Sequence, residues 1–179
     1  SKGPASLCIP RAAVEALLNA KATAYEVCTY LVLARFTEAT GVYSTASPSA
    51  VNRYTGANKT KTGTVAKAIE RLLTIRAEKV EKVSNGRSGK SHAMVNKTID
   101  LGAILFNRTG WLEKTGEVLP DGPTDRSTVQ FVLPDFGEER QSRVWFGSGL
   151  VDGFEGFKKP LKIVKNGGDV VARLLLAMY

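Results

Sequence analysis

The sequence predicts a protein of the α+β class, on the basis of three observations. Apolar residues recur with helical spacing in several segments before residue 74, two segments of alternating polarity follow, and short strand-like runs separated by turns dominate after Leu101. The chain has 179 residues, of which 43% are hydrophobic and 23% are charged, as is usual for a globular protein. We expect two parts, residues 1–100 and residues 101–179, the second of which is rich in strands and ends in a helix.

Two helices are expected near the start of the chain. The first covers residues 11–20, because Pro10 suits a first helical turn and an apolar stripe that includes Val14 and Leu17 follows it. A capping box, Thr23-Ala24-Tyr25-Glu26, opens the second helix. Apolar residues are too numerous in this second helix for a surface stripe, so we expect it to be the most buried element and to end at Gly41.

A pair of shorter helices is expected next, after a brief strand at 42–43. The first of the pair covers residues 47–56, with a serine cap at its start and a glycine at its end. The second covers residues 60–73, in which apolar residues recur at i, i+4, i+7 and i+8 from Val65. Two helices joined by a tight turn result.

The remaining predicted elements are mostly strands. Two of them form a hairpin around the glycine-containing loop 84–90, and turn-rich stretches separate the others. A last amphipathic helix is predicted from Asp169 to Tyr179, and the absence of a stop signal indicates either a fragment or a helix that ends on a partner. The predicted strands cover residues 77–83, 91–99, 111–112, 127–133 and 143–146.

Positive charge is concentrated in one quarter of the chain. The sequence has 25 basic and 17 acidic residues, which gives a net charge of +8. Between Arg53 and Lys97 there are 11 basic and 3 acidic residues, whereas the rest of the chain has 14 of each. A charge that served only solubility would be spread out, so this focused excess favours an anionic partner.

The most informative motif lies between residues 47 and 73. It is Ser47-Pro48-Ser49-Ala50-Val51-Asn52-Arg53-Tyr54-Thr55-Gly56-Ala57-Asn58-Lys59-Thr60-Lys61-Thr62-Gly63-Thr64-Val65-Ala66-Lys67-Ala68-Ile69-Glu70-Arg71-Leu72-Leu73. Together with the basic hairpin that follows, this pattern resembles the winged helix-turn-helix family of DNA-binding domains over residues 10–99. The resemblance implies that the second helix of the pair enters the major groove of duplex DNA and that the hairpin acts as a wing.

Helix geometry assigns candidate DNA contacts to this region. A recognition helix buries one face and presents the other, which places Lys61, Thr62, Thr64, Lys67 and Arg71 outward, with base contacts expected from Lys61, Thr64 and Lys67. The turn and the positive end of the helix dipole suit phosphate binding by Asn58, Lys59 and Thr60. The resemblance further implies backbone or minor-groove contacts from Arg87 and Lys90, and phosphate contacts from Ser47 and Asn52.

The expected function is that of a cytoplasmic, nucleoid-associated transcriptional regulator that binds double-stranded DNA. Two alternatives remain open: a plasmid or phage replication or partition protein that binds repeated sites, and an adaptor whose basic face binds an acidic protein. Basic residues on an exposed helix are also commonly no more than a solvated face. A homodimer remains open as well, since two-fold sites are common for such proteins.

The second half of the chain also allows two interpretations. A strand near residues 143–146, a basic segment at 158–165 and a helix follow in the order expected for the start of a second winged helix. Alternatively, the aromatic residues there form the core of the second part or cover the first; they are Trp145, Phe146, Phe154 and Phe157.

Catalytic, metal and membrane functions are not indicated. Residues 84–91 nearly match a phosphate-binding loop, but alternating polarity on both sides predicts strands, whereas such a loop must open a helix. His92 is the only histidine, and Cys8 and Cys28 lack clustered ligands, so we expect no enzyme, metal site or cofactor. The longest apolar run, Val27 to Ala34, is too short to span a membrane, and no secretory signal precedes it.

Overall fold

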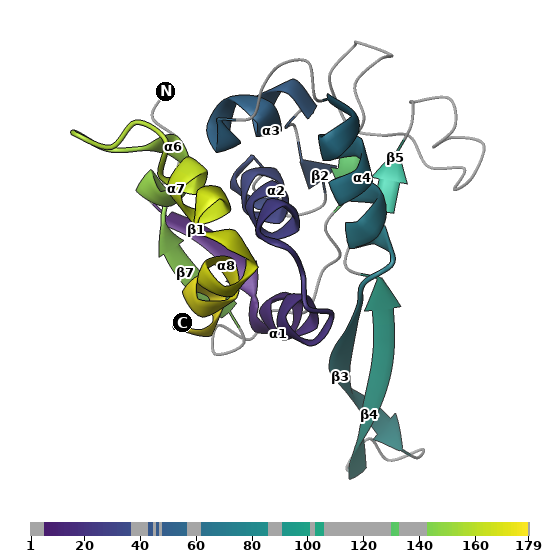
Figure 1. The fold of residues 1–179 in the computed structure, drawn as a ribbon. Coiled ribbons are helices and arrows are strands. Elements are labelled where there is room, and N and C mark those ends of the chain that lie inside the picture. Colours follow the sequence, from purple (N-terminus) through teal and green to yellow (C-terminus); the bar gives the residue numbers. More distant parts are fainter. Residues whose placement is uncertain are drawn as a thin grey trace.

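The computed structural model describes residues 6–36, 43–44, 46, 48–56, 62–85, 91–100, 103–105, 130–132 and 143–178. The protein combines helices with small antiparallel sheets, so the α+β class is confirmed (Figure 1). In chain order the elements are β1 (Ser6–Pro10), α1 (Arg11–Asn19), α2 (Ala24–Arg35), β2 (Tyr43–Ser44), α3 (Pro48–Thr55), α4 (Thr62–Leu73), β3 (Arg76–Asn85), β4 (Ser91–Asp100), β5 (Ala103–Leu105), β6 (Gln130–Val132), β7 (Arg143–Gly147), α6 (Gly149–Asp152), α7 (Pro160–Asn166) and α8 (Gly168–Ala177).

Helix α2 forms the centre of the core, as predicted. Ten of its 12 residues are buried. The capping box is present: the Glu26 amide donates to Thr23 Oγ1 (3.2 Å), and the Thr23 amide donates to Glu26 Oε2 (2.9 Å). The helix ends at Arg35, so the predicted end at Gly41 is wrong; Phe36 follows as the C-cap and its ring lies 5.2 Å from that of Tyr54.

A strand near the start of the chain pairs with a strand from its C-terminal part in one small sheet. Strand β1 pairs antiparallel with β7, which sets Leu7 opposite Phe146 and Ile9 opposite Val144, and all four side chains are buried. No sequence signal predicted β1, because five residues are too few to establish an alternating pattern. Its pairing with β7 ties the C-terminal part of the chain directly to the first helices.

The described C-terminal elements share the core of the N-terminal helices. Leu161 of α7 and Leu176 of α8 belong to the same buried cluster as α2, and both helices pack against α2 (Figure 1). A bidentate ion pair adds to this contact, since Arg35 Nη2 lies 2.7 Å from Asp152 Oδ2 and Arg35 Nε lies 3.1 Å from Oδ1. Among the described residues, the buried side chains of α6, α7 and α8 thus belong to the same core as α2.

The helical content of this C-terminal region exceeds the prediction. Helix α7, which has Pro160 at its first position, begins within the basic segment at 158–165 and ends one residue beyond it. Helix α8 begins at Gly168, one residue before the predicted start. Asp169 of α8 accepts a hydrogen bond from the Ala24 amide (2.8 Å), so α8 helps to cap α2. None of the described helices is long and apolar enough to cross a lipid bilayer.

Two further sheets are small. Strands β2, β6 and β5 form one in that order, with Phe131 opposite both Ser44 and Ile104. The hairpin of β3 and β4 forms the other. The strands predicted at 127–133 and 143–146 are present as β6 and β7, whereas the strand predicted at 111–112 lies outside the described residues.

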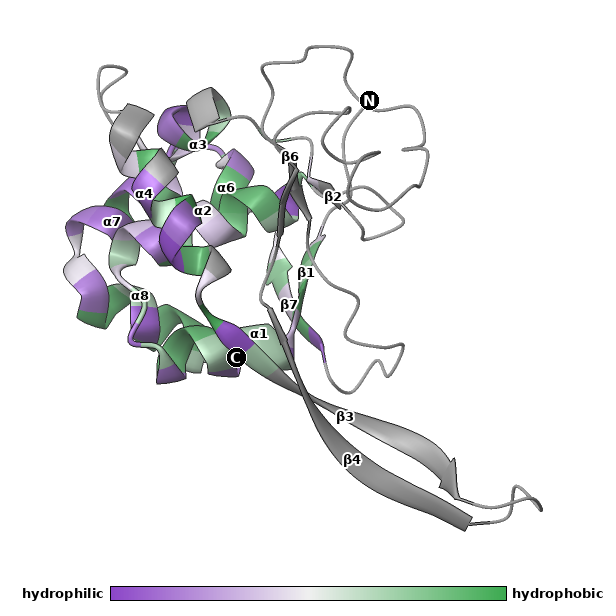
Figure 2. Ribbon diagram, turned by 90° about the vertical axis from the view of Figure 1, so that its right-hand side faces the viewer, coloured by the Kyte–Doolittle hydropathy of each residue, from purple (hydrophilic) through white to green (hydrophobic). Residues whose placement is uncertain are grey.

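The predicted α3 and α4 pair and the hairpin are present in the expected order. Helix α3 begins at Pro48 and ends before Gly56, which has a φ of +65°, and α4 ends at Leu73. The helices carry alternating hydrophobic and hydrophilic residues (Figure 2), as expected for elements with one face in a core. Strand β4 begins at Ser91, so the near-match to a phosphate-binding loop precedes a strand and not the helix that such a loop requires.

Candidate nucleic-acid interface

Helix α4 is held to the protein by one apolar face. Val65, Ala68, Ile69 and Leu72 are buried, at the i, i+3, i+4 and i+7 positions of a helical stripe. The helix packs against α2 and α3, whereas α7 and α8 lie on the other side of α2 (Figure 1). The described C-terminal helices therefore leave the outer face of α4 uncovered.

The outer face of α4 is polar. Thr64, Lys67, Glu70 and Arg71 are exposed. Lys67 forms no ion pair with any residue that the structure describes, so its ammonium is available to an anion. Glu70 places one negative charge on the same face, which disfavours close approach of a phosphate at that point.

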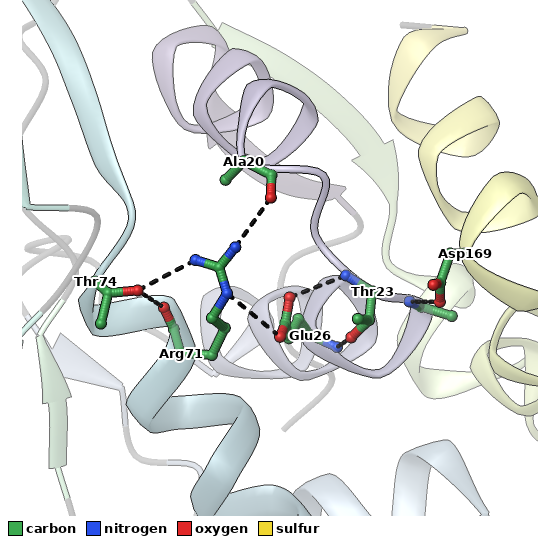
Figure 3. Close-up of polar contacts among 7 residues, drawn as sticks. Ala20, Thr23, Glu26, Arg71, Thr74 and Asp169 are labelled. Atoms are coloured by element: carbon green, nitrogen blue, oxygen red, sulfur yellow. Dashed lines mark hydrogen bonds and ion pairs between the residues drawn. The ribbon is translucent and has the colours of Figure 1, made fainter.

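Arg71 has a different environment from the one expected of a base-reading side chain. Its Nη2 donates to the Ala20 carbonyl oxygen (3.0 Å), its Nη1 donates to Thr74 Oγ1 (3.2 Å), and its Nε lies 3.9 Å from Glu26 Oε1 (Figure 3). These contacts join the end of α4 to the turn between α1 and α2. Arg71, predicted as an outward DNA contact, therefore positions α4 through these bonds to the protein.

Side chains from α4 and from α8 both reach the first turn of α2. Figure 3 shows Thr23 and Glu26 between Arg71, which comes from α4, and Asp169, which comes from α8. Glu26 is buried although it is charged, because its carboxylate accepts from the Thr23 amide and lies near the Arg71 guanidinium. The orientation of α4 and the placement of α8 thus depend on adjacent residues.

Asn52 of α3 is buried in the interior of the protein. Only 4% of its surface is exposed, and its Oδ1 accepts a hydrogen bond from the Tyr25 hydroxyl (3.0 Å). Burial raises the pKa of Tyr25, which keeps that hydroxyl a donor. The phosphate contact expected of Asn52 does not fit this position, because a buried amide cannot reach a phosphate on the surface.

Most of the other predicted contact residues lie outside the part of the chain that the structure describes. Thr62 is the first residue of α4, and nothing further is described for it. Predicted contact residues that lie outside the described part of the chain are Ser47, Asn58, Lys59, Thr60, Lys61, Arg87 and Lys90. Among the predicted set, the structure thus places Thr64 and Lys67 on one exposed surface.

The β3–β4 hairpin begins three residues after α4 and extends away from the helices (Figure 1). Ten residue pairs are in register, from Arg76 opposite Asp100 to Asn85 opposite Ser91. Its base is anchored where β3 packs against α1 and Ala77 is buried. A ten-residue strand rises about 33 Å, which is enough to carry its far end, where Asn85 pairs with Ser91, well beyond α4.

Two basic residues on or beside α3 were not proposed as DNA contacts from the sequence. Arg53 is exposed in the last turn of α3, and its place within the basic window was the available signal. Lys162 of α7 is the second: a Cβ at Gly56 would lie 2.8 Å from Lys162 Cδ, so the lysine stem lies directly on the end of α3. No local pattern could have revealed a contact between residues so distant in the sequence.

The ionisable groups of the core have structural roles. Burial raises the pKa of the Cys28 thiol to about 12, and its Sγ lies 3.6 Å from the Leu161 carbonyl oxygen. Burial also raises the pKa of Tyr30. Within the described ranges there is no group of three or more histidine, cysteine, aspartate or glutamate residues that could hold a metal ion.

Comparison with known proteins adds no relative to this description. Searches with the chain matched no protein-family model, no curated protein and no solved structure.

Proposed function

We propose that this protein binds double-stranded DNA in a sequence-specific manner and acts as a transcriptional regulator. Helix α4 enters the major groove, the β3–β4 hairpin acts as the wing, and the arrangement is that of a winged helix-turn-helix. The observation that carries the proposal is the two-sided character of α4: one face is buried, and the other presents Thr64 and Lys67 to solvent beside a projecting hairpin.

The dimensions and charge of this region support the proposal. A helix of 12 residues is about 18 Å long, and a major groove about 12 Å wide admits it. The window from Arg53 to Lys97, which includes α4, β3 and all but the last three residues of β4, holds the entire net charge of the chain. A positive field of this kind attracts the phosphate backbone whatever the sequence.

The proposed contacts follow from the exposed positions. Lys67 donates to a guanine edge or a phosphate, and Thr64 contacts a base edge or a thymine methyl group. Arg71 acts indirectly, because it holds α4 against the α1–α2 turn. Lys59, Lys61, Arg87 and Lys90 remain proposed phosphate or base contacts on the strength of the sequence.

The experiment is a selection of bound duplexes from random DNA, followed by anisotropy titrations of the selected duplex. Lys67→Ala should weaken binding about 5- to 150-fold if Lys67 reads a base edge, and should leave the protein folded. Lys158→Ala is the matched control, since it removes the same charge from an exposed position in the C-terminal region. Equal losses in the two variants, or no selected sequence, would contradict specific reading by α4.

A further inference from the structure

A lysine from the C-terminal region packs onto the end of α3. A Cβ built on Gly56 would lie 3.4 Å from Lys162 Cβ, 3.1 Å from Cγ and 2.8 Å from Cδ, so the stem comes closer to α3 along its length. Gly56 has a φ of +65°, which favours glycine, and its missing side chain leaves room for this stem. Because Lys162 is exposed, the packed stem brings a solvated ammonium of α7 to the end of α3.

The two helices that meet here carry only positive charge. Neither α3 nor α7 contains an acidic residue. Arg53 is exposed in the last turn of α3, three residues before Gly56, so both positions lie on one side of that helix. Among the described residues, neither Arg53 nor Lys162 forms an ion pair. We call these two side chains the α3–α7 basic pair.

The charges around this pair do not neutralise it. Lys165, the other basic residue of α7, is half-buried. Asp152 of α6 is already bound to Arg35, with 2.7 Å between Oδ2 and Nη2. The exposed charged residues of the loop before α7 are Glu155, Lys158 and Lys159, which together add a charge of +1. The local field is therefore positive, and it favours an anionic partner.

The place of α3 in the fold indicates which anion meets the pair. Helix α3 packs against both α4 and α7, so it links the proposed reading helix to the C-terminal helices (Figure 1). A helix in the major groove is flanked by phosphate strands, and the first helix of a helix-turn-helix crosses one of them. A duplex that holds α4 therefore brings phosphates to α3. The outer face of α4 includes the carboxylate of Glu70, whereas α3 and α7 oppose a phosphate with none.

We propose that Arg53 and Lys162 bind the phosphate backbone of the duplex that α4 reads, so that the C-terminal region takes part in DNA binding through α7. The inference rests on the proposed function, because α4 sets the position of the duplex. Phosphate contacts carry no sequence information, so the pair contributes affinity and orientation and leaves the choice of sequence to α4.

The test uses variants that keep the packed stem of Lys162 and change its charge. Lys162→Met should weaken binding of the selected duplex and of a scrambled duplex by the same factor, about 5- to 10-fold near 0.1 M salt. The slope of log affinity against log salt should become shallower by about 0.9, and Lys162→Arg should restore both quantities. Lys158→Met is the matched control: it removes the same charge from an exposed loop position and should have a far smaller effect on both.

A second variant leaves the packing of Lys162 on Gly56 unchanged. Arg53→Gln should reduce the affinity and the salt slope in the same way, and chemical denaturation should show each variant folded. Wild-type affinity and slope in Lys162→Met and Arg53→Gln, with Lys67→Ala still impaired, would overturn this inference and leave the proposed function in place. A loss of stability without a change in slope, or equal losses in Lys158→Met and Lys162→Met, would also overturn it. A wild-type protein that binds no duplex would overturn both.

Discussion

Helices α4 and α8 pack on opposite sides of α2 and each buries one apolar face, but their solvent-exposed faces differ in chemistry. On one flank α4 buries an apolar stripe and turns Thr64 and Lys67 to solvent; on the other, α8 buries Ala172 and Leu176 and turns Leu174 and its neighbours to solvent. The inner faces explain the fold, and the outer faces differ in chemistry. A charged outer face suits an anion, and an apolar one suits another apolar surface.

The largest difference in stability is expected between leucine-to-alanine substitutions on the buried face of α4 and on the exposed face of α8. Leu72→Ala opens a cavity under α4 and should lower the free energy of unfolding by about 2–5 kcal/mol. Leu174→Ala, at a position 57% exposed, should change the stability of the monomer by less than about 0.5 kcal/mol. Chemical denaturation at low protein concentration measures both, and similar losses would mean that the faces of α8 are wrongly assigned.

The polar contacts of Arg71 orient α4 on its side of α2, so their removal should affect this side of the molecule alone. Arg71→Ala removes the hydrogen bond to the Ala20 carbonyl oxygen and the nearby positive charge from Glu26, and should cost about 1–3 kcal/mol of stability. DNA affinity should fall while the salt dependence stays unchanged, since no phosphate contact is lost. A reduced salt slope with unchanged stability would show instead that Arg71 touches DNA.

The buried Cys28 thiol, which lies against α7, should make the stability of the protein depend on pH in the alkaline range. In the folded protein its pKa is about 12, against 9.0 for an unperturbed thiol, so the folded state keeps its proton while the unfolded state loses it. Stability should therefore be insensitive to this group below pH 9 and fall above it, by up to about 1.4 kcal/mol per pH unit. Comparing the alkaline limb of wild type with that of Cys28→Ala isolates the contribution, and identical limbs would contradict the assignment.

The smallest effect on stability is expected from Lys67. Lys67→Ala should change the free energy of unfolding by less than about 0.5 kcal/mol, because the side chain is exposed and has no partner among the described residues. Thermal denaturation of this variant beside Leu72→Ala measures the difference between the two faces of α4. A large loss for Lys67→Ala would mean that the helix is rotated relative to this description.

Local signals accounted for the elements that the sequence predicted well. The capping box at Thr23 specified the start of α2, and the apolar repeat from Val65 specified the buried face of α4, because both depend on residues within a few positions of each other. The end of α2 was misplaced since Gly41 is only a weak stop signal beside the cap formed at Phe36.

Contacts between distant residues explain what the sequence could not give. The pairing of β1 with β7 joins segments more than 130 residues apart, and a strand of five residues is too short for its sequence to predict which strand it pairs with. The same holds for the candidate interface: Arg71 was assigned to DNA because its partner on α1–α2, the Ala20 carbonyl, is a backbone group without a sequence signature. Asn52 was likewise assigned to phosphate because its contact with Tyr25 spans two helices.

The salt dependence of duplex affinity tests the central claim most directly. If α4 and the hairpin neutralise about 6 phosphates, the logarithm of the binding constant should fall with the logarithm of salt concentration with a slope near −5. Lys67→Ala should make the slope shallower by about 1 if this lysine contacts a phosphate, whereas Leu174→Ala should leave the slope per protomer unchanged. A slope near zero for the wild-type protein, or a slope that does not respond to substitutions on α4 and the hairpin, would contradict the account.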